Sequence, residues 1–270
     1  MNGSSRSIAI KKNIIASLFL KGISILVSLQ VVPLTINYIN PTRYGIWLTL
    51  SSIVAWLSYF DLGFAHGFRN RFAEAVAKGD MQLAREYVST TYVVLSLLFS
   101  SVFLIAIVVN HFVDWSAILN VDAAYSSELN IVFGILAFFF CLNIVASIFT
   151  TMLTANQKPA LASLIQTLGQ VFGFICIYIL TKTVPGNLDV LAFAFSGVPC
   201  FLLIIISIGM FLSGRYRHLS PSFHFVHFSL TKKIVGLGGQ FFIIMISMLF
   251  VFQLINIVIS REAGPMAVTQ

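Results

Sequence analysis

The sequence predicts an all-α, polytopic membrane protein with about seven transmembrane helices. Hydrophobic residues make up 58% of the 270 residues and charged residues only 9%, so the chain has too little polar surface to coat a soluble globule. A helix needs about 20 apolar residues to cross a bilayer. Seven apolar stretches of roughly this length occur, at residues 14–39, 44–67, 88–112, 129–153, 159–181, 190–213 and 236–260.

Helices are favoured over the strands of a β-barrel. Barrel strands alternate apolar and polar residues, whereas residues 201–208 and 241–252 are apolar on every side.

Cys141, Cys176 and Cys200 lie inside predicted spans, and no Cys or His pair has metal-ligand spacing. Paired carboxylates, Ser-His-Asp sets and Gly-rich phosphate loops are also missing, so we predict no catalytic residues, no metal, no cofactor and a protein that is not an enzyme.

The first span resembles a signal peptide because basic residues precede an apolar run. The run is too long, is interrupted by Lys21 and lacks a cleavage site, so we predict an uncleaved helix. A lysine at the bilayer centre costs about 2.5–3.5 kcal/mol. Lys21 either snorkels to the inner surface or faces a watery cavity where it meets an anionic substrate. The same helical face carries Ser17, Ser24, Ser28 and Thr35.

The second span also has a polar face, and Asp61 lies beside it. We consider Asp61 either an interfacial partner of Arg69 or a carboxylate that couples transport to protons or sodium. Residues 68–87 then predict a short helix at the cytoplasmic interface, broken at Gly79-Asp80. The polar face of the span comprises Thr49, Ser52, Trp56, Tyr59, Gly63 and His66.

Polar stripes recur in the fourth, fifth and seventh spans. Close helix packing is one interpretation, supported by the small-residue motif Gly169-x-x-x-Gly173, and a polar cavity is the other. The stripes comprise Asn143, Ser147, Thr150 and Thr154, then Ser163, Gln166 and Gln170, then Gln253, Asn256 and Ser260.

Between the sixth and seventh spans, basic and aromatic residues at 214–235 favour anchoring to lipid headgroups over a substrate contact.

The net charge of +7 reflects topology. Basic residues concentrate in the N-terminal segment and in alternate loops, which is the pattern of loops that stay in the cytoplasm. We therefore predict a cytoplasmic N-terminus and no nucleic-acid partner.

One block of the sequence is more specific than hydropathy. It runs from Tyr44-Gly45-Ile46-Trp47 through Phe60-Asp61-Leu62-Gly63 to Gly67-Phe68-Arg69-Asn70-Arg71, and it continues to Lys78-Gly79-Asp80. With Asn156-Gln157-Lys158-Pro159 and the Gln253–Ile259 region, it resembles bacterial polysaccharide (O-antigen type) flippases of the multidrug/oligosaccharidyl-lipid/polysaccharide exporter superfamily.

The resemblance implies two six-helix lobes around a central cleft in the bacterial inner membrane. Residues 1–235 would form the N-terminal lobe, and 236–270 would begin a C-terminal lobe that the sequence does not contain. The substrate would be an oligosaccharide on undecaprenyl pyrophosphate, turned between leaflets by alternating access, with membrane lipids and polysaccharide-assembly proteins as further partners. Candidate substrate-binding residues are Lys21, Trp56, Tyr59, Arg69, Arg71, Asn143, Gln253 and Asn256, with Asp61 for ion coupling.

Other functions remain open at this point. A multidrug or cation antiporter of the same fold should carry an acidic residue deep in a helix, but the deepest charge here is Lys21. A membrane enzyme of the same pathway should carry a large outer loop or clustered His and Arg, and the outer loops are short. A non-transporting fragment is the third alternative.

Overall fold

The computed structural model describes residues 3–57, 63–119, 121–240, 242–244 and 247, with side chains omitted at 3–12 and 42. Throughout these residues the regular structure is helical, which confirms the all-α class. The longer helices are α1 (Gly3–Ile39), α2 (Pro41–Ala55), α3 (Phe64–Ala77), α4 (Met81–Phe112), α6 (Ser126–Ala146), α7 (Ile148–Ala155), α8 (Pro159–Thr183) and α10 (Val198–Leu212). The shorter ones are α5 (Trp115–Leu119), η2 (Ala123–Tyr125), α9 (Leu188–Ala192), η3 (Phe193–Gly197), η4 (Arg217–Leu219) and η5 (Phe223–Phe225).

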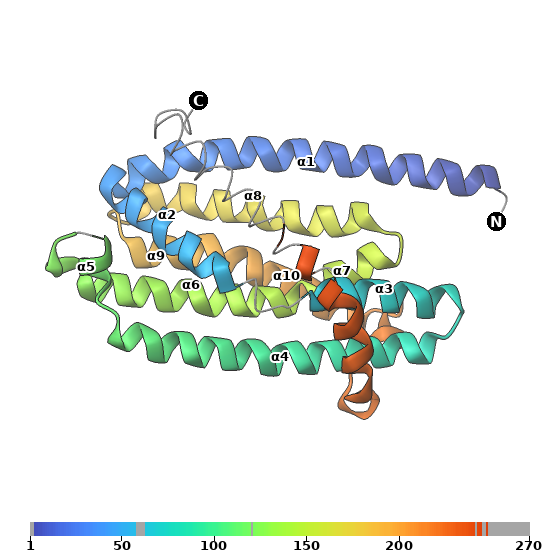
Figure 1. The fold of residues 1–270 in the computed structure, drawn as a ribbon. Coiled ribbons are helices and arrows are strands. Elements are labelled where there is room, and N and C mark those ends of the chain that lie inside the picture. Colours follow the sequence, from blue (N-terminus) through green and yellow to red (C-terminus); the bar gives the residue numbers. More distant parts are fainter. Residues whose placement is uncertain (1–2, 58–62, 120, 241, 245–246, 248–270) are drawn as a thin grey trace, which may run out of the picture.

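The long helices lie side by side in one elongated bundle (Figure 1). α1 packs along α8, α8 packs on α10, and both α10 and α4 pack on α6. Five described helices are long and apolar enough to cross a membrane, and they coincide with the first, third, fourth, fifth and sixth predicted spans. The chain is therefore a multi-pass membrane protein.

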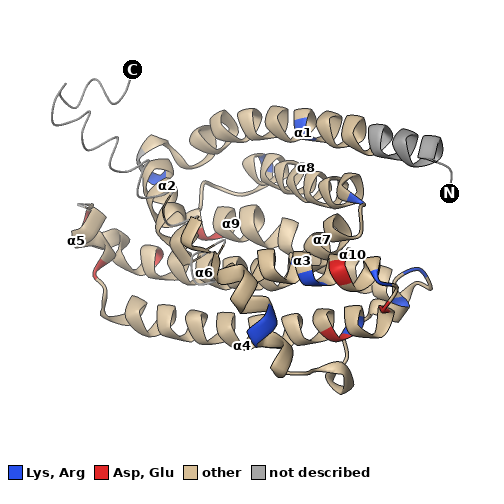
Figure 2. Cartoon of the chain, turned by 45° about the vertical axis from the view of Figure 1, so that its right-hand side comes forward, with Lys and Arg blue, Asp and Glu red and all other residues tan. Residues whose placement is uncertain are grey.

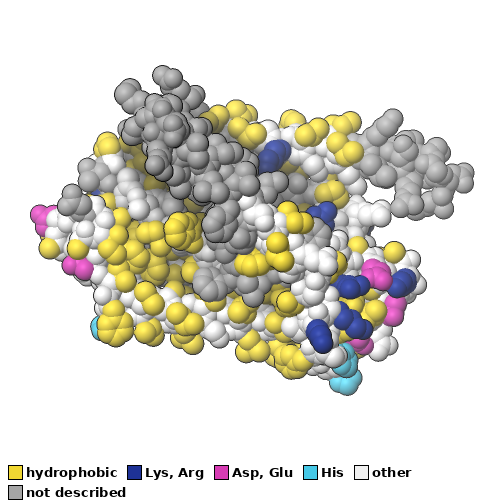
Figure 3. Space-filling model, in the orientation of Figure 1, with side chains coloured by type: hydrophobic (Ala, Val, Ile, Leu, Met, Phe, Trp, Pro, Cys, Tyr) yellow, Lys and Arg dark blue, Asp and Glu magenta, His cyan; other side chains and the backbone are white. Residues whose placement is uncertain are grey.

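Most charged residues lie toward the two ends of the bundle (Figure 2). The connections at 78–80, 156–158 and 213–228 meet at one end, which we call the basic end. The connections at 40, 113–125 and 184–187 meet at the opposite end, here the far end. Figure 3 shows Lys and Arg side chains gathered at the basic end, beside a surface covered by hydrophobic side chains.

The second predicted span is divided into two helices. Asn40 caps α2 by accepting a hydrogen bond from the Arg43 N–H at 3.0 Å, and α2 ends at Ala55. α3 begins after Gly63, whose φ of 75° lies outside the α-helical region. One continuous helix over 44–67 was therefore a wrong prediction. α2 packs on α1 and α6, whereas α3 packs on α4 and α7, so the two helices contact different parts of the bundle.

The start of α3 is held by a crossing of two backbones. A side chain at Gly63 would collide with the carbonyl oxygen of Gly238, and one at Gly67 would collide with the carbonyl oxygen of Ile234. A side chain at Gly238 would in turn collide with the carbonyl oxygen of Gly63. Residues 229–240 are helical, so this helix begins before the predicted start at Gly236. Small residues spaced four apart allow such close contact in membranes.

α3 is more deeply buried than the interfacial helix that the sequence predicts. Phe64, Phe68 and Phe72 are at most 3% exposed and pack in the core. The predicted break at Gly79-Asp80 is confirmed, because Asp80 caps the next helix by accepting from the Leu83 N–H at 2.9 Å. α4 consequently begins at Met81, before the predicted Val88.

The apolar residues form two separate cores along the bundle. One lies toward the basic end and includes Phe68, Phe149 and Tyr216. The other lies toward the far end and includes Leu50 and Leu129. Trp47 belongs to this second core and lines two cavities beside it.

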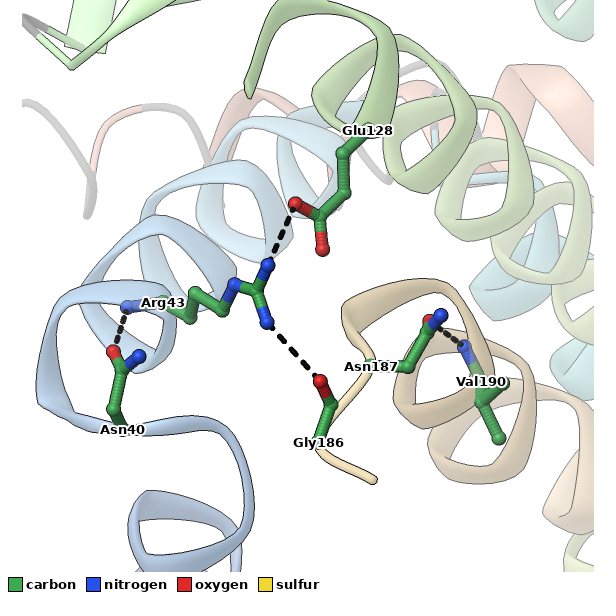
Figure 4. A network of polar contacts seen from close by, with 6 residues as sticks. All are labelled: Asn40, Arg43, Glu128, Gly186, Asn187 and Val190. Carbon is green, nitrogen blue, oxygen red and sulfur yellow. Dashed lines mark hydrogen bonds and ion pairs between the residues drawn. The ribbon is translucent and has the colours of Figure 1, made fainter. Parts of the chain in front are cut away.

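Arg43 joins three segments at the far end (Figure 4). Its guanidinium donates to the carbonyl of Gly186 at 3.0 Å and pairs with Glu128 at 3.4 Å. The same group lies over the ring of Tyr125, 5.6 Å from its centroid. Arg43 thus ties the start of α2 to α6 and to the loop before α9.

We expect Gly238→Ala to destabilise the protein, because an added methyl group must push apart two backbones. Overpacking of this kind costs about 1–3 kcal/mol. Gly236 lies in the same helix with open space around its Cα, so Gly236→Ala is the matched control and should be neutral or stabilising. Thermal denaturation in detergent measures both variants, and equal midpoints would contradict the crossing.

Arg43→Met should lower the free energy of unfolding by about 1–3 kcal/mol, since it removes hydrogen bonds to a carboxylate and a carbonyl. Lys182, an exposed lysine at the end of α8, provides the control Lys182→Met. Chemical denaturation in mixed micelles compares the two variants. Equal losses would show that Arg43 does not hold the three segments together.

Candidate polar cavities between the helices

A cavity of about 360 Å³ lies between α1, α2, α8 and η3. Its walls are mainly apolar, with four residues that bring hydroxyl or amide groups: Ser28, Thr35, Tyr44 and Gln170. Cavities of a few hundred Å³ with few polar groups are typical of ligand sites.

The polar stripe of α1 faces α8 along this cavity. Ser24 Oγ donates a hydrogen bond to Gln170 Oε1 across the two helices. Ser28 donates to the carbonyl of Ser24 at 2.9 Å, and Thr35 donates to the carbonyl of Val31 at 2.7 Å. The hydroxyl protons of Ser28 and Thr35 are therefore used within α1, while their oxygen atoms keep lone pairs that a ligand can use. Both sequence interpretations hold here, because the stripe packs the helices and also lines a cavity.

A second cavity, of about 230 Å³, lies between α2, α6 and η3. Asn143, Ser51 and Ser196 provide its polar groups. The Ser51 Oγ atom is buried and has no hydrogen-bond partner within the described part of the chain. A buried hydroxyl without a partner is unfavourable unless a ligand or water supplies one.

An aromatic pair borders both cavities. Trp47 and Phe195 line each of them, and their rings meet edge to face with centroids 5.1 Å apart. Trp47 is 3% exposed, so the pair forms the wall between the two cavities. Aromatic faces suit the apolar faces of sugar rings, and hydroxyl and amide groups suit their edges.

Pro199 explains why Phe195 lies in this wall. Proline has no N–H to donate to the residue four positions earlier, and the turn before it, η3, is a wide π-helix that includes Phe195. Gly169 and Gly173 of α8 provide room for Pro199, which lies 3.2 Å from where a Gly169 Cβ would stand. The predicted small-residue contact is therefore a contact between α8 and α10.

Two predicted site residues lie on exposed surfaces near the cavities. Lys21 is one turn before Ser24 on the same stripe, is exposed, and has no hydrogen bond or ion pair to any described residue. Trp56 is 71% exposed and follows Thr49 and Ser52 on a face of α2 that the described helices leave uncovered. A polar face within a membrane span is costly against hydrocarbon, so this face favours contact with water or another polar surface.

The two predicted arginines lie elsewhere, on α3. Arg69 is exposed, and Arg71 pairs with Glu74 at 3.0 Å and donates to the carbonyl of Lys233. Neither arginine lines the two cavities. Tyr59, Asp61, Gln253 and Asn256 lie outside the described residues. Within the described residues, no three His, Cys, Asp or Glu side chains gather closely enough to bind a metal.

Trp47, Phe195 and Ser51 are cavity residues that the sequence did not predict. The sequence does contain a signal for the wall that Trp47 and Phe195 form. Pro199 lies within a predicted span, and the Gly169-x-x-x-Gly173 motif lies in the span before it. Pairing the two required the tertiary structure.

Comparison with known proteins gives one finding. A family described as polysaccharide biosynthesis protein matches residues 10–269. No curated protein and no solved structure gives a significant match.

Cysteine labelling tests whether the cavities and the exposed face of α2 contact water. Ser28, Ser52 and Ser101 each donate to the carbonyl four residues earlier, but Ser101 lies on the exposed apolar face of α4. With the native cysteines replaced by alanine, Ser28→Cys and Ser52→Cys should react at least about tenfold faster than Ser101→Cys with a charged thiol reagent, because only a hydrated thiol ionises readily. Equal rates would mean that the polar faces are dry.

Proposed function

Because the chain belongs to the polysaccharide biosynthesis protein family, matched over residues 10–269, we propose that it flips an undecaprenyl-pyrophosphate-linked oligosaccharide across the bacterial inner membrane. The N-terminus and the basic end would lie in the cytoplasm, where basic loops are retained. The single observation that carries this proposal is a pair of aromatic-walled cavities with hydroxyl and amide groups, in a bundle with many exposed apolar side chains.

The cavities match the chemistry of an oligosaccharide headgroup. Gln170, Asn143 and the Ser51 hydroxyl offer donors and acceptors at the cavity walls. Trp47 and Phe195 offer ring surfaces between them. A sugar entering this region would exchange its hydrogen bonds to water for bonds to these groups, which reduces the penalty of moving polar groups into the membrane.

Lys21 is the proposed partner of the pyrophosphate. A diphosphate in a low-dielectric layer needs a nearby cation, because an unpaired charge there is very unfavourable. Lys21 is exposed and precedes Ser24 and Ser28 on the stripe, and Ser28 lines the first cavity. In this proposal the ammonium group would guide the phosphates while the sugars enter the cavities.

The exposed face of α2 would line the central cleft. Trp56 would stack on sugars there, and the polyprenyl tail would stay among the surrounding lipid chains. Arg69 lies on α3 toward the basic end, where an exposed guanidinium suits recruitment of the headgroup. Arg71 is already paired with Glu74, so we assign it to holding the Lys233 backbone.

The alternatives make different demands on the site. An antiporter for drugs or cations needs an acidic group in the transport path, and among the described residues neither cavity has one in its lining. Drug efflux by cells that express the protein, without an effect on surface glycan, would favour the antiporter. An enzyme of the same pathway would change the glycan chemically, which mass spectrometry of the lipid-linked product detects.

Loss of the gene should cause undecaprenyl-linked oligosaccharide to accumulate on the cytoplasmic leaflet, because synthesis continues while transfer stops. Leaflet-specific labelling of the intermediate measures this accumulation. Normal surface glycan without accumulation would contradict the proposed function.

Lys21→Ala should reduce glycan export about tenfold or more, since loss of a charge-assisted contact is worth about 1.5–3 kcal/mol. Lys21→Arg should retain part of the activity because it keeps the charge. Lys182→Ala, at the other end of the bundle, is the matched control, and immunoblotting of membranes checks insertion. Normal export by Lys21→Ala would mean that Lys21 only snorkels.

A further inference from the structure

A segment after α10 folds back against the start of α4. This segment, residues 214–228, is here called the strap. Arg85 Nε donates to the carbonyl of Ser220 at 2.9 Å, and the Ser222 N–H donates to Ser89 Oγ at 3.1 Å. The His227 N–H donates to Thr90 Oγ1 at 3.0 Å. η4 and η5 of the strap both pack on α4, so its backbone is fixed in place.

The inner side of the strap is anchored by buried side chains. Tyr216 and Leu219 are at most 1% exposed, and the hydroxyl of Tyr216 accepts a hydrogen bond from Lys158 at 3.1 Å. The guanidinium of Arg85 lies 4.1 Å from the centroid of the Phe225 ring. These contacts leave the opposite side of the strap to the surroundings.

The strap combines exposed aromatic rings with a mainly apolar cavity along its boundary with α4. Phe223 is 87% exposed and Phe228 is 63% exposed. A cavity of about 450 Å³ lies between the strap and α4, with Tyr92, Val93, Leu97 and Phe223 among its lining residues. Leu97 is 60% exposed and lies within a membrane-spanning helix, so this cavity borders hydrocarbon.

The charge of the strap is uniformly positive. Arg215 and Arg217 are exposed and form no ion pair with any side chain that the structure describes, and the strap itself contains no Asp or Glu. His218 and His224 are exposed as well. The neighbouring acid is Glu86 of α4, which lies 3.7 Å from His227 of the strap. Exposed arginines on a segment that also lines an apolar groove complement an anionic headgroup joined to an acyl chain.

We propose that the strap and α4 form a binding groove for an anionic phospholipid of the leaflet at the basic end. One acyl chain lies along Tyr92, Leu97 and Phe223, and the phosphate meets Arg215 and Arg217. The bound lipid is a structural partner that fixes the depth of the bundle in the membrane. This role is separate from the flipping of a glycan carrier.

Tryptophan quenching by brominated lipids tests the proposal. Phe223→Trp keeps an aromatic ring at the groove, and Phe112→Trp is the matched control, because Phe112 is 81% exposed on α4 near the far end. The full chain is placed in nanodiscs with a fixed fraction of brominated phosphatidylglycerol or brominated phosphatidylcholine, and the fluorescence of the unsubstituted chain is subtracted. We expect Phe223→Trp to be quenched more strongly by the anionic lipid, and Phe112→Trp to be quenched equally by both.

The arginines are tested in the Phe223→Trp background. Arg215→Ala and Arg217→Ala should each weaken the anionic preference about fivefold, as expected for one basic residue near an anionic surface, whereas Lys182→Ala should not change it. Equal quenching of Phe223→Trp by both lipids, or no quenching, would overturn the proposal. Displacement of the quenching lipid by an equimolar polyprenyl pyrophosphate would also overturn it, by assigning the groove to the transported carrier. None of these readouts depends on flipping activity.

Discussion

The backbone crossing at Gly63, Gly67 and Gly238 is the contact on which the described bundle depends. Within a membrane, backbone groups that leave a helix need partners in the protein, so a span can be interrupted only where other segments surround it. Here the helix of residues 229–240 lies directly against the first turn of α3, with no side chain between the two backbones. The crossing therefore supports the interruption of the second predicted span and attaches the helix of residues 229–240 to the start of α3.

The interruption has consequences for the middle of the bundle. Because α2 packs toward the far end and α3 toward the basic end, the apolar residues gather in two cores. Beside the far-end core lie the π-turn at Phe193–Gly197 and the two cavities that share Trp47 and Phe195. Discontinuous helices near the bilayer centre are a common basis for substrate sites in transporters. The proposed headgroup path uses this region, and the proposed phospholipid groove lies apart from it at the basic end.

Prediction from the sequence succeeded where one local pattern decides the structure. Of the seven spans that apolar length predicted, five coincide with described helices that can cross a membrane. The predicted break at Gly79-Asp80 is confirmed, and Gly169-x-x-x-Gly173 predicted a close helix contact. It failed for the second span and for α3. The stretch around Phe60 reads as continuous apolar helix, and the amphipathic pattern of α3 does not say whether its apolar face meets lipid or protein. Arg71, a candidate substrate-binding residue, is paired with Glu74, and its proposed role stays a prediction.

The sequence by itself determined that the protein lies in a membrane, its helical class, its family and the polar stripe that includes Lys21, because composition and spacing are properties of the chain alone. Only the tertiary structure decided which partner each stripe meets. Ser24 contacts Gln170 across α1 and α8, Trp47 meets Phe195, and Gly63 meets Gly238, although each pair is far apart in sequence. The physical reason is that a helix's own periodicity fixes which residues share a face, whereas the packing of whole helices fixes what that face touches.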